Sequence, residues 1–372
     1  MKQSTLNPDI VFIRDVIRSG GDSVKKCYQC ATCSVVCNNS PDENPFPRKE
    51  MIWTQWGLKD RLVNDPDIWL CHQCDDCSVY CPREAKPMEV LAALRKMTIA
   101  HHAVPGFFAK MFKSAGYLPI LFGIPVVFLL FVLFVSGHLN IPDGEVLYSK
   151  MFSHMAINIS FTAMFFLACG MAFIGGKNFW NGMKADFGEP KGETSFIGAC
   201  IKVSKQIMLH SKFKECDANK SRFTSHLLVF WGFIGLLVVT ALAVVSIVLY
   251  HYYPLPQTNL IKILGNVSAI AFFVGLTIMM LNRLSSKTSQ SRGTFFDWVF
   301  LLDLYGVVLT GIAVEYLRVF NGGAIAYIMY FIHLVFVFFL LVYFPYSKFI
   351  HFAYRFLAMV YAVMTGREVV RT

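Results

Sequence analysis

The chain has 372 residues, of which 55% are hydrophobic, 15% aromatic and only 16% charged, and it contains 35 phenylalanines. This composition is richer in apolar and aromatic side chains than that of an ordinary soluble protein, so it indicates a membrane protein. The formal charge of +10 is not accompanied by a nucleic-acid-binding motif, and nucleic acid is therefore not an expected partner.

The first part of the chain differs from the rest. Residues 1–100 are polar, lack a long apolar run and hold eight of the 11 cysteines. Residues 1–26 have neither the apolar core nor the cleavage site of a secretory signal, so this part is expected to stay in the cytoplasm. We predict a cytoplasmic ferredoxin-like domain over residues 1–100 and an amphipathic linker over 101–117.

One cysteine pattern occurs twice in this predicted domain, which we call the head. Residues 27–37 read CYQCATCSVVC and residues 71–81 read CHQCDDCSVYC, and both are C-x2-C-x2-C-x3-C. In two-cluster ferredoxins the first three thiolates of such a run bind one 4Fe-4S cluster and the fourth binds the other. The pattern therefore predicts a first cluster on Cys27, Cys30, Cys33 and Cys81, and a second on Cys71, Cys74, Cys77 and Cys37.

Zinc and disulfides are the alternative uses of these cysteines. Zinc sites have no use for a third cysteine at the same spacing, and a reducing cytoplasm disfavours disulfides. Proline follows Cys81, as is common in such runs, whereas Asn38 follows Cys37. The insert between the runs, centred on MIWTQWGLKDRLV, is predicted to be helical. Three cysteines stand apart and are not expected ligands: Cys169, Cys200 and Cys216.

The remainder of the chain contains six apolar segments, each close to the length of about 20 helical residues that crosses a bilayer. We place them at 118–137, 152–175, 226–250, 260–281, 297–318 and 324–345. The predicted fold is therefore mainly α, with the head fused to a six-helix transmembrane cytochrome b domain over 118–351 and a cytoplasmic tail over 352–372.

Charge predicts the orientation of these segments. The loop 176–224 carries nine lysines and arginines, whereas the loops 138–151 and 251–259 contain one lysine between them. Basic loops remain on the cytoplasmic side. Six crossings then leave both termini inside, which predicts a multi-pass protein of the cytoplasmic membrane.

Two histidines border the last apolar segment. The eighteen residues from His333 to His351 make five whole helical turns, so both histidines are predicted to lie on one face of the last helix, about 27 Å apart. A neutral imidazole that binds haem iron is satisfied inside a helical bundle, and each b haem takes two such ligands. The spacing predicts that this helix supplies one ligand to each of two haems.

The other two ligands must lie at matching depths. His226 begins a helix on the cytoplasmic side and is predicted to share an inner haem with His351, while His154 begins a helix on the outer side and is predicted to share an outer haem with His333. The weaker candidates are His72, His101, His102, His138, His210 and His251.

The stretch HLVFVFFLLVYFPYSKFIH resembles the final helix of the γ subunit of respiratory nitrate reductases. The resemblance implies that His333 serves the outer haem and His351 the inner one. In that family a single earlier helix provides both remaining ligands, ten residues apart. Here His226 matches the first position but Leu236 occupies the second, which is the reason for proposing His154.

The fusion of a two-cluster head to this membrane domain is similar to the C subunits of the quinone-interacting membrane-bound oxidoreductase (Qmo) family. Its two parts resemble the C and E subunits of heterodisulfide reductase. The resemblance implies a protein that oxidises menaquinol in the lipid bilayer and passes electrons to flavin and iron–sulfur partners similar to the A subunit of heterodisulfide reductase (the Qmo A and B subunits). The implied final acceptor is adenylylsulfate (APS) reductase, in sulfate respiration.

Quinol oxidation requires a proton acceptor, for which the apolar segments offer Glu315 and Asp303; a salt bridge to Arg318 is the alternative role of Glu315. Three other readings of the chain remain. One is a redox-sensing anchor without haem. Another is a cation transporter, which would need several acidic residues at the midplane. The third is the membrane subunit of a heterodisulfide-reductase-like complex with another acceptor or the opposite electron direction.

Overall fold

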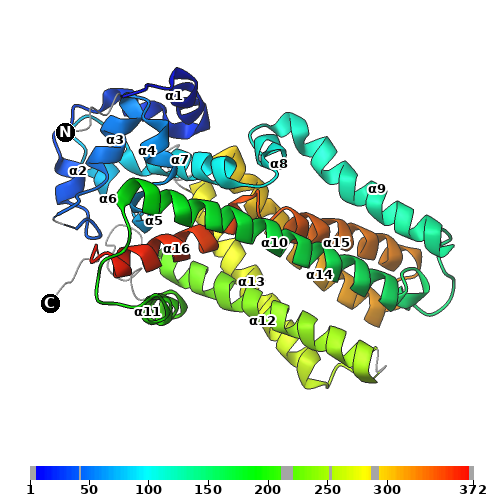
Figure 1. Cartoon of the computed structure of the whole chain (residues 1–372). Helices are drawn as coiled ribbons and strands as arrows, with labels where there is room; N and C mark the ends of the chain where they lie inside the picture. The colour runs from blue at the N-terminus through cyan, green and yellow to red at the C-terminus, as the bar shows by residue number, and fades with distance from the viewer. Residues whose placement is uncertain (1–5, 42, 211–220, 251–253, 286–292, 368–372) are drawn as a thin grey trace. The chain divides into compact units, whose positions relative to one another are not determined.

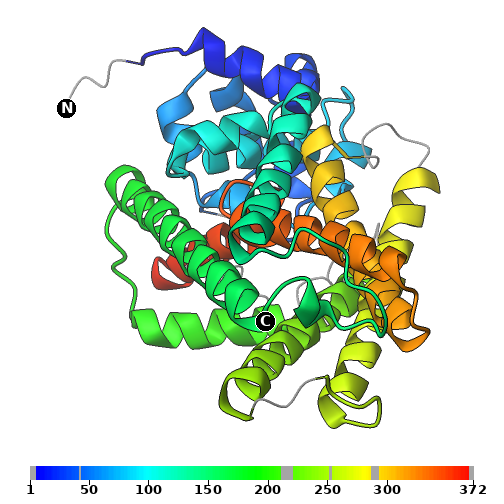
Figure 2. The ribbon, with the colours of Figure 1, turned by 90° about the vertical axis from the view of Figure 1, so that its right-hand side faces the viewer.

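The computed structural model (Figures 1 and 2) describes residues 6–41, 43–210, 221–250, 254–285 and 293–367. Its regular elements in these ranges are all helices, as predicted. The chain forms two compact units. We call residues 1–113, 171–223 and 348–372 the head unit, and residues 114–170 and 224–347 the span unit.

The head unit begins with a series of short helices. They are α1 (Ile10–Val16), η1 (Ile17–Gly21), η2 (Asp22–Lys26), α2 (Thr32–Val35), α3 (Arg48–Gln55), α4 (Lys59–Val63), α5 (Asp67–Leu70), α6 (Asp76–Val79), α7 (Pro87–His102) and α8 (Gly106–Met111). Later parts of the chain complete the unit: the second half of α10 (His154–Phe187), α11 (Phe196–Leu209), η6 (Lys348–Ile350) and α16 (His351–Met364).

Helix α7 is the centre of the head unit and contacts α1, α3, α4, α5 and α6 (Figure 1). Pro87 is its first residue, a position that suits proline because the backbone N–H there would have no partner within the helix. Glu89 lies in the first turn, where a negative charge favours the helix start. Val90, Leu94 and Met97 recur at helical spacing and are buried. Helix α7 thereby packs against several short helices, including α6, which carries Cys77.

The insert between the cysteine runs is helical, as predicted, and its described part contains α3, α4 and α5. Gly57 separates α3 from α4 with φ 68°, and a Cβ at this position would lie 3.0 Å from the backbone N of Asp9. The Gly57 carbonyl also accepts a hydrogen bond of 2.9 Å from that N–H. Only glycine combines this conformation with so close a contact, so the break is built into the sequence.

Buried rings fix α16 within the head unit. Tyr354 of α16 stacks on Trp69 of α5 with ring centroids 5.2 Å apart, and Phe179 of α10 lies 5.2 Å from Tyr354. His102 joins this group and its Nε2 lies 3.1 Å from the Val63 carbonyl. This contact identifies His102 as a packed core histidine.

The span unit contains η3 (Ala115–Tyr117), α9 (Leu118–Ser136), η4 (Tyr148–Lys150), the first half of α10, most of α12 (Ser221–Tyr250), α13 (Leu260–Ser285), α14 (Phe295–Val319) and α15 (Ala324–Val342). Six helices of the described chain are long and apolar enough to cross a membrane: 115–136, 154–187, 223–249, 260–285, 295–319 and 324–342. The prediction of six segments is confirmed.

Helix α14 packs along α15, while α13 lies on α14 and α9 on α15 (Figures 1 and 2). Thr294 and Asp297 form a capping box that begins α14, with the Thr294 N–H donating to Asp297 over 2.8 Å. Side chains such as Val127, Phe131 and Phe134 of α9 are exposed, which suits contact with lipid tails.

The expectation of one helix through His333 and His351 is wrong. Helix α15 ends at Val342, and after a turn around Pro345 the short helix η6 precedes α16, which starts at His351. Pro345 lacks an N–H and clashes with the preceding helical turn, so the helix stops before it. His333 therefore belongs to the span unit and His351 to the head unit, and whole-turn spacing does not relate them.

Candidate cofactor sites

Two cavities in the head unit are each lined by four cysteines. The first is bordered by Cys27, Cys30, Cys33 and Cys81. The second is bordered by Cys71, Cys74, Cys77 and Cys37. The fourth cysteine of each run thus lies with the first three of the other run, which is the grouping that the C-x2-C-x2-C-x3-C pattern predicts.

The repeated sequence produces a repeated loop. Gln29 and Gln73, two residues after the first cysteine of each run, have φ 62° and 54°, and Ala31 and Asp75, just after the second cysteine, have φ 68° and 81°. The short helices α2 and α6 follow at the same offset and contact each other. Each loop therefore curls around its cavity with its thiols facing inward.

The thiols suit a bound metal cluster. Burial raises the pKa of Cys33 to about 12, with nearby Cys27, Cys30 and Cys81 adding to the shift. Burial likewise raises the pKa of Cys37 to about 12, helped by Cys71. Four crowded thiolates need a cationic partner, and irons supply it. All ten cysteines in the described ranges are free thiols, whereas Cys216 lies outside them.

His333 is held by α14. Its Nδ1 lies 2.9 Å from the Thr310 hydroxyl, which donates its own proton to the Gly306 carbonyl over 2.6 Å. The imidazole must therefore donate from Nδ1, which leaves the lone pair on Nε2. Gly311 makes room for the ring, since a Cβ there would lie 3.1 Å from its Cε1. Metal-binding histidines are commonly oriented in this way.

His351 shows the same arrangement in the head unit. Its Nδ1 lies 2.8 Å from the Lys348 carbonyl, which can only accept, so Nε2 again keeps its lone pair. Burial lowers the pKa of His351 to about 4, and the positive charge of Lys348 adds to this shift. The ring is therefore neutral at physiological pH, as a haem ligand must be.

The other two predicted haem ligands lie at helix starts. His154 is the first residue of α10, and its neighbours Phe152 and Phe161 pack against Tyr330 and Phe338 of α15, on either side of His333. His226 lies in the second turn of α12, in the span unit. The weaker candidate His251 lies outside the described residues, and His210 is buried at the end of α11.

The two predicted proton acceptors differ in their surroundings. Glu315 accepts hydrogen bonds from Gln257 and Lys262, so its ion pair is with Lys262 of α13 instead of Arg318. Asp303 is 3% exposed on α14, and its Oδ1 has no hydrogen-bond partner among the described residues. Of the two acids, Asp303 is thus the one whose Oδ1 has no hydrogen-bond donor among the described residues.

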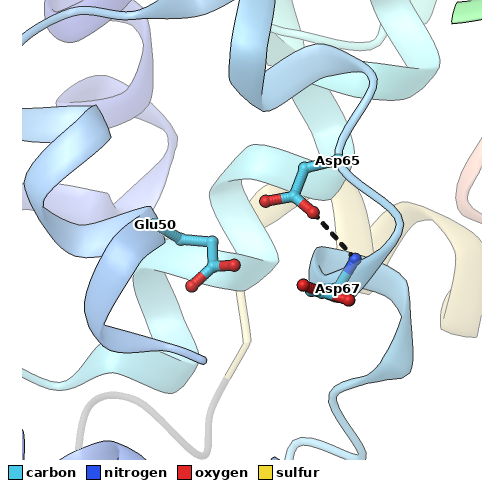
Figure 3. A group of neighbouring side chains, drawn as sticks. All are labelled: Glu50, Asp65 and Asp67. Atoms are coloured by element: carbon cyan, nitrogen blue, oxygen red, sulfur yellow. Dashed lines mark hydrogen bonds between the residues drawn. The ribbon is translucent and has the colours of Figure 1, made fainter. Parts of the chain in front are cut away.

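A group of buried acids in the head unit was not predicted from the sequence. Glu50, Asp65 and Asp67 are fully buried and turn their carboxylates toward one another (Figure 3). The Lys49 ammonium contacts all three, at 3.3 Å from Glu50 and 3.5 Å from Asp65, and Arg367 lies 3.7 Å from Asp67. These cations identify an ion-pair network that fastens the C-terminal segment within the head unit.

Comparison with known proteins gives two family matches. Residues 165–370, more than half of the chain, match the family described as citrate utilization protein B. Residues 23–85, which contain both cysteine runs, match the 4Fe-4S dicluster domain. No solved structure matches the chain.

Individual relatives fall into the same two groups. Citrate utilization protein B of Escherichia coli is 28% identical over 317 residues, which are 77% of this chain and 78% of that protein. The C subunit of the H(2):CoB-CoM heterodisulfide,ferredoxin reductase of Methanothermobacter marburgensis is 34% identical over 111 residues, or 30% of this chain. The chain spans just over half (57%) of that relative's length. The C2 subunit of the H(2)/formate:CoB-CoM heterodisulfide,ferredoxin reductase of Methanococcus maripaludis is 31% identical over 144 residues, covering 77% of its length.

Proposed function

We propose that this chain is the membrane electron-transfer subunit of an oxidoreductase complex. The chain belongs to the citrate utilization protein B family, and its head belongs to the family of the heterodisulfide reductase C subunits. The observation that carries the proposal is the exchange of fourth cysteines between two four-thiol cavities, on a chain with six potential membrane spans. When bound, the 4Fe-4S clusters supply one-electron transfer between a membrane donor and a soluble partner.

The membrane reactant is menaquinol, and two b haems link it to the head. We assign His226 and His351 to the inner haem and His154 and His333 to the outer one. The Nδ1 contacts of His333 and His351 support this assignment, because each favours the tautomer in which Nε2, the nitrogen that would bind iron, carries no proton. Asp303 is the favoured acceptor of a quinol proton, and Glu315, already neutralised by Lys262, is the weaker one.

In the direction that we favour, menaquinol is the donor and electrons leave through flavin and iron–sulfur partners resembling the Qmo A and B subunits toward APS reductase. The protein then resides in the cytoplasmic membrane with both termini inside. In a second candidate function, electrons pass in the opposite direction, from a soluble partner to the quinone. This partner would act in citrate utilization, as the name of the Escherichia coli relative indicates.

Haem quantitation on the purified full-length chain tests the membrane half of the proposal. We expect two b haems, the loss of one in His351→Ala and His226→Ala, and the loss of the other in His333→Ala and His154→Ala. His138→Ala, an exposed position in the loop after α9, is the control and keeps both. A full haem complement in His154→Ala would refute the outer pair, and no haem in the native chain would refute both pairs.

The direction is tested separately by adding menaquinol or menaquinone to the complex with its partner proteins. Reduction of the clusters by menaquinol favours the first candidate. Faster reduction of menaquinone by chemically reduced partner favours the second.

A further inference from the structure

Different side chains donate hydrogen bonds to equivalent backbone carbonyls of the two cysteine loops. At the first loop, the Gln55 side-chain amide donates to the carbonyls of Val24 and Cys27 over 2.9 and 3.0 Å. At the second loop, the Arg95 guanidinium donates to Ile68, over 2.9 Å, and to Cys71. Val24 and Ile68 each lie three residues before the first cysteine of their run. A neutral amide in one loop is thus replaced by a cation in the other.

A second basic side chain, from a distant part of the sequence, also contacts the second loop. Arg355 of α16 donates to the Cys71 carbonyl over 3.4 Å, and its guanidinium lies 2.8 Å from Nδ1 and 3.1 Å from Nε2 of His72. Two guanidinium groups therefore meet at the first ligand residue of the second cavity. The equivalent carbonyl of the first loop, at Cys27, accepts from an uncharged side chain.

Arg355 also lies close to the predicted haem ligand His351. The two are four residues apart on α16, so they share one helix face. The stack of Tyr354 on Trp69, 5.2 Å between centroids, holds α16 against α5, and Arg95 lies 5.4 Å from the Trp69 ring. Buried aromatic packing thus fixes the contact between this end of α16 and the second loop.

Cations near the first cavity are placed differently. Arg48 and Arg83 line it, but both are exposed to solvent, whereas Arg95 and Arg355 are half-buried. Water and salt screen exposed charges far more than buried ones. The first cavity also has the exposed ligand residue Cys30, while Cys71 and Cys77 of the second cavity are buried.

We infer that the second cluster is the one next to the haem-binding end of α16, and that Arg355 is a positioning residue that raises the reduction potential of this cluster above that of the first. This inference rests on the proposed function. Reduction adds a negative charge to a cluster, and a half-buried cation at the loop stabilises that charge. With both clusters bound, the second would exchange electrons on the side of α16, and the first, near the exposed Cys30, with a soluble partner.

The test is a mediated redox titration of the full-length chain, followed by EPR spectroscopy, with Cys30→Ser used to assign the signals of the first cluster. We expect Arg355→Gln to lower the reduction equilibrium constant of the second cluster about tenfold, ~59 mV for one electron, and to leave the first cluster unchanged. Arg355→Lys, which keeps the charge, should restore most of the shift. Arg48→Gln is the matched control and should move neither potential by more than about a third of that amount.

A second variant covers the case in which Arg355→Gln does not fold. Gln55→Lys places a cation at the position that contacts the carbonyls of the first loop, and it should raise the reduction equilibrium constant of the first cluster about tenfold. Unchanged potentials in Arg355→Gln, or in Gln55→Lys if only that protein folds, would overturn the inference. Because chemical mediators replace quinol and haem, the outcome is independent of whether menaquinol is the donor.

Discussion

At the scale of single residues, hydrogen bonds separate side chains that look alike in the sequence. Glu315 and Asp303 are both acids in an apolar helix, yet Glu315 is bound by Gln257 and Lys262 while Asp303 is buried with Oδ1 unpaired among the described residues. A carboxylate with two donors is stabilised as the anion and accepts a proton poorly. Among the described residues no donor contacts Oδ1 of Asp303, and we therefore favour Asp303 as the proton acceptor.

We therefore expect Asp303→Asn to slow the reduction of haem by menaquinol by about a hundredfold, the loss typical of a missing general base. Glu315→Gln is the matched control and should change the rate less than about threefold, since its role is the ion pair. Stopped-flow absorbance at the haem band, with haem content measured in parallel, gives both rates. Equal rates in native protein and Asp303→Asn would remove Asp303 from the quinol site.

At the scale of helices, charge balance ties distant segments together. Glu50 of α3, Asp65 of the loop and Asp67 of α5 bring three negative charges, against which Lys49 and Arg367 bring two positive ones. Burial raises the pKa of Glu50 well above its ordinary value and also raises that of Asp65, and in both cases the positive charge of Lys49 opposes the shift. Glu50 is therefore the group that holds the proton needed to balance the network.

A raised pKa in the folded state means that the folded protein keeps a proton that the unfolded chain releases. The free energy of unfolding must then fall as the pH rises from the ordinary carboxyl range through the raised pKa. We expect thermal unfolding in detergent to show this decline for the native chain as the pH rises above the ordinary carboxyl range, and a flatter curve for Glu50→Gln, which mimics the protonated acid.

The matched comparison is Asp67→Asn, which leaves Lys49 and Arg367 short of negative charge. It should lower the free energy of unfolding by about 3 kcal/mol, as is usual when a buried ion pair loses one partner. If Glu50→Gln is as destabilising as Asp67→Asn near pH 7, then Glu50 is ionised in the folded protein and does not hold the balancing proton.

At the scale of the whole molecule, the two cavities depend on residues from both cysteine runs. Cys81 lies more than 40 residues from the other thiols of its cavity, and Cys37 is separated from those of the second cavity by more than 30. The helices α2 and α6 contact each other, and α7 packs against the insert, so folding brings the runs together.

Because of this exchange, we expect Cys81→Ser to impair the first cluster and Cys37→Ser the second, in each case the cluster of the other run. Cys33→Ser and Cys77→Ser are the matched variants within the runs, and they should impair the first and the second cluster respectively. Iron content and the EPR signal of each cluster are the measurements. If Cys81→Ser reproduces the spectrum of Cys77→Ser, each run binds its own cluster.

The sequence by itself was sufficient for the features that depend on local pattern. The cysteine spacing predicts how the eight thiols are grouped, because a short loop has few ways to turn its sulfurs inward, and apolar length predicts six spans, because lipid leaves backbone groups unpaired outside a helix. Pro345 also marks the end of α15 in the sequence, since proline cannot continue a helix, and one helix through His333 and His351 was therefore the wrong expectation.

Only the tertiary structure decided which distant polar groups meet. The pairing of Glu315 with Lys262, the pairing of Lys49 and Arg367 with Asp67, and the contact of Arg355 with the Cys71 loop join residues between 18 and 300 positions apart. No short-range pattern encodes such pairs, because they follow from how helices pack. The sequence also does not show whether a charged side chain is surrounded by water or paired with another charge in the interior.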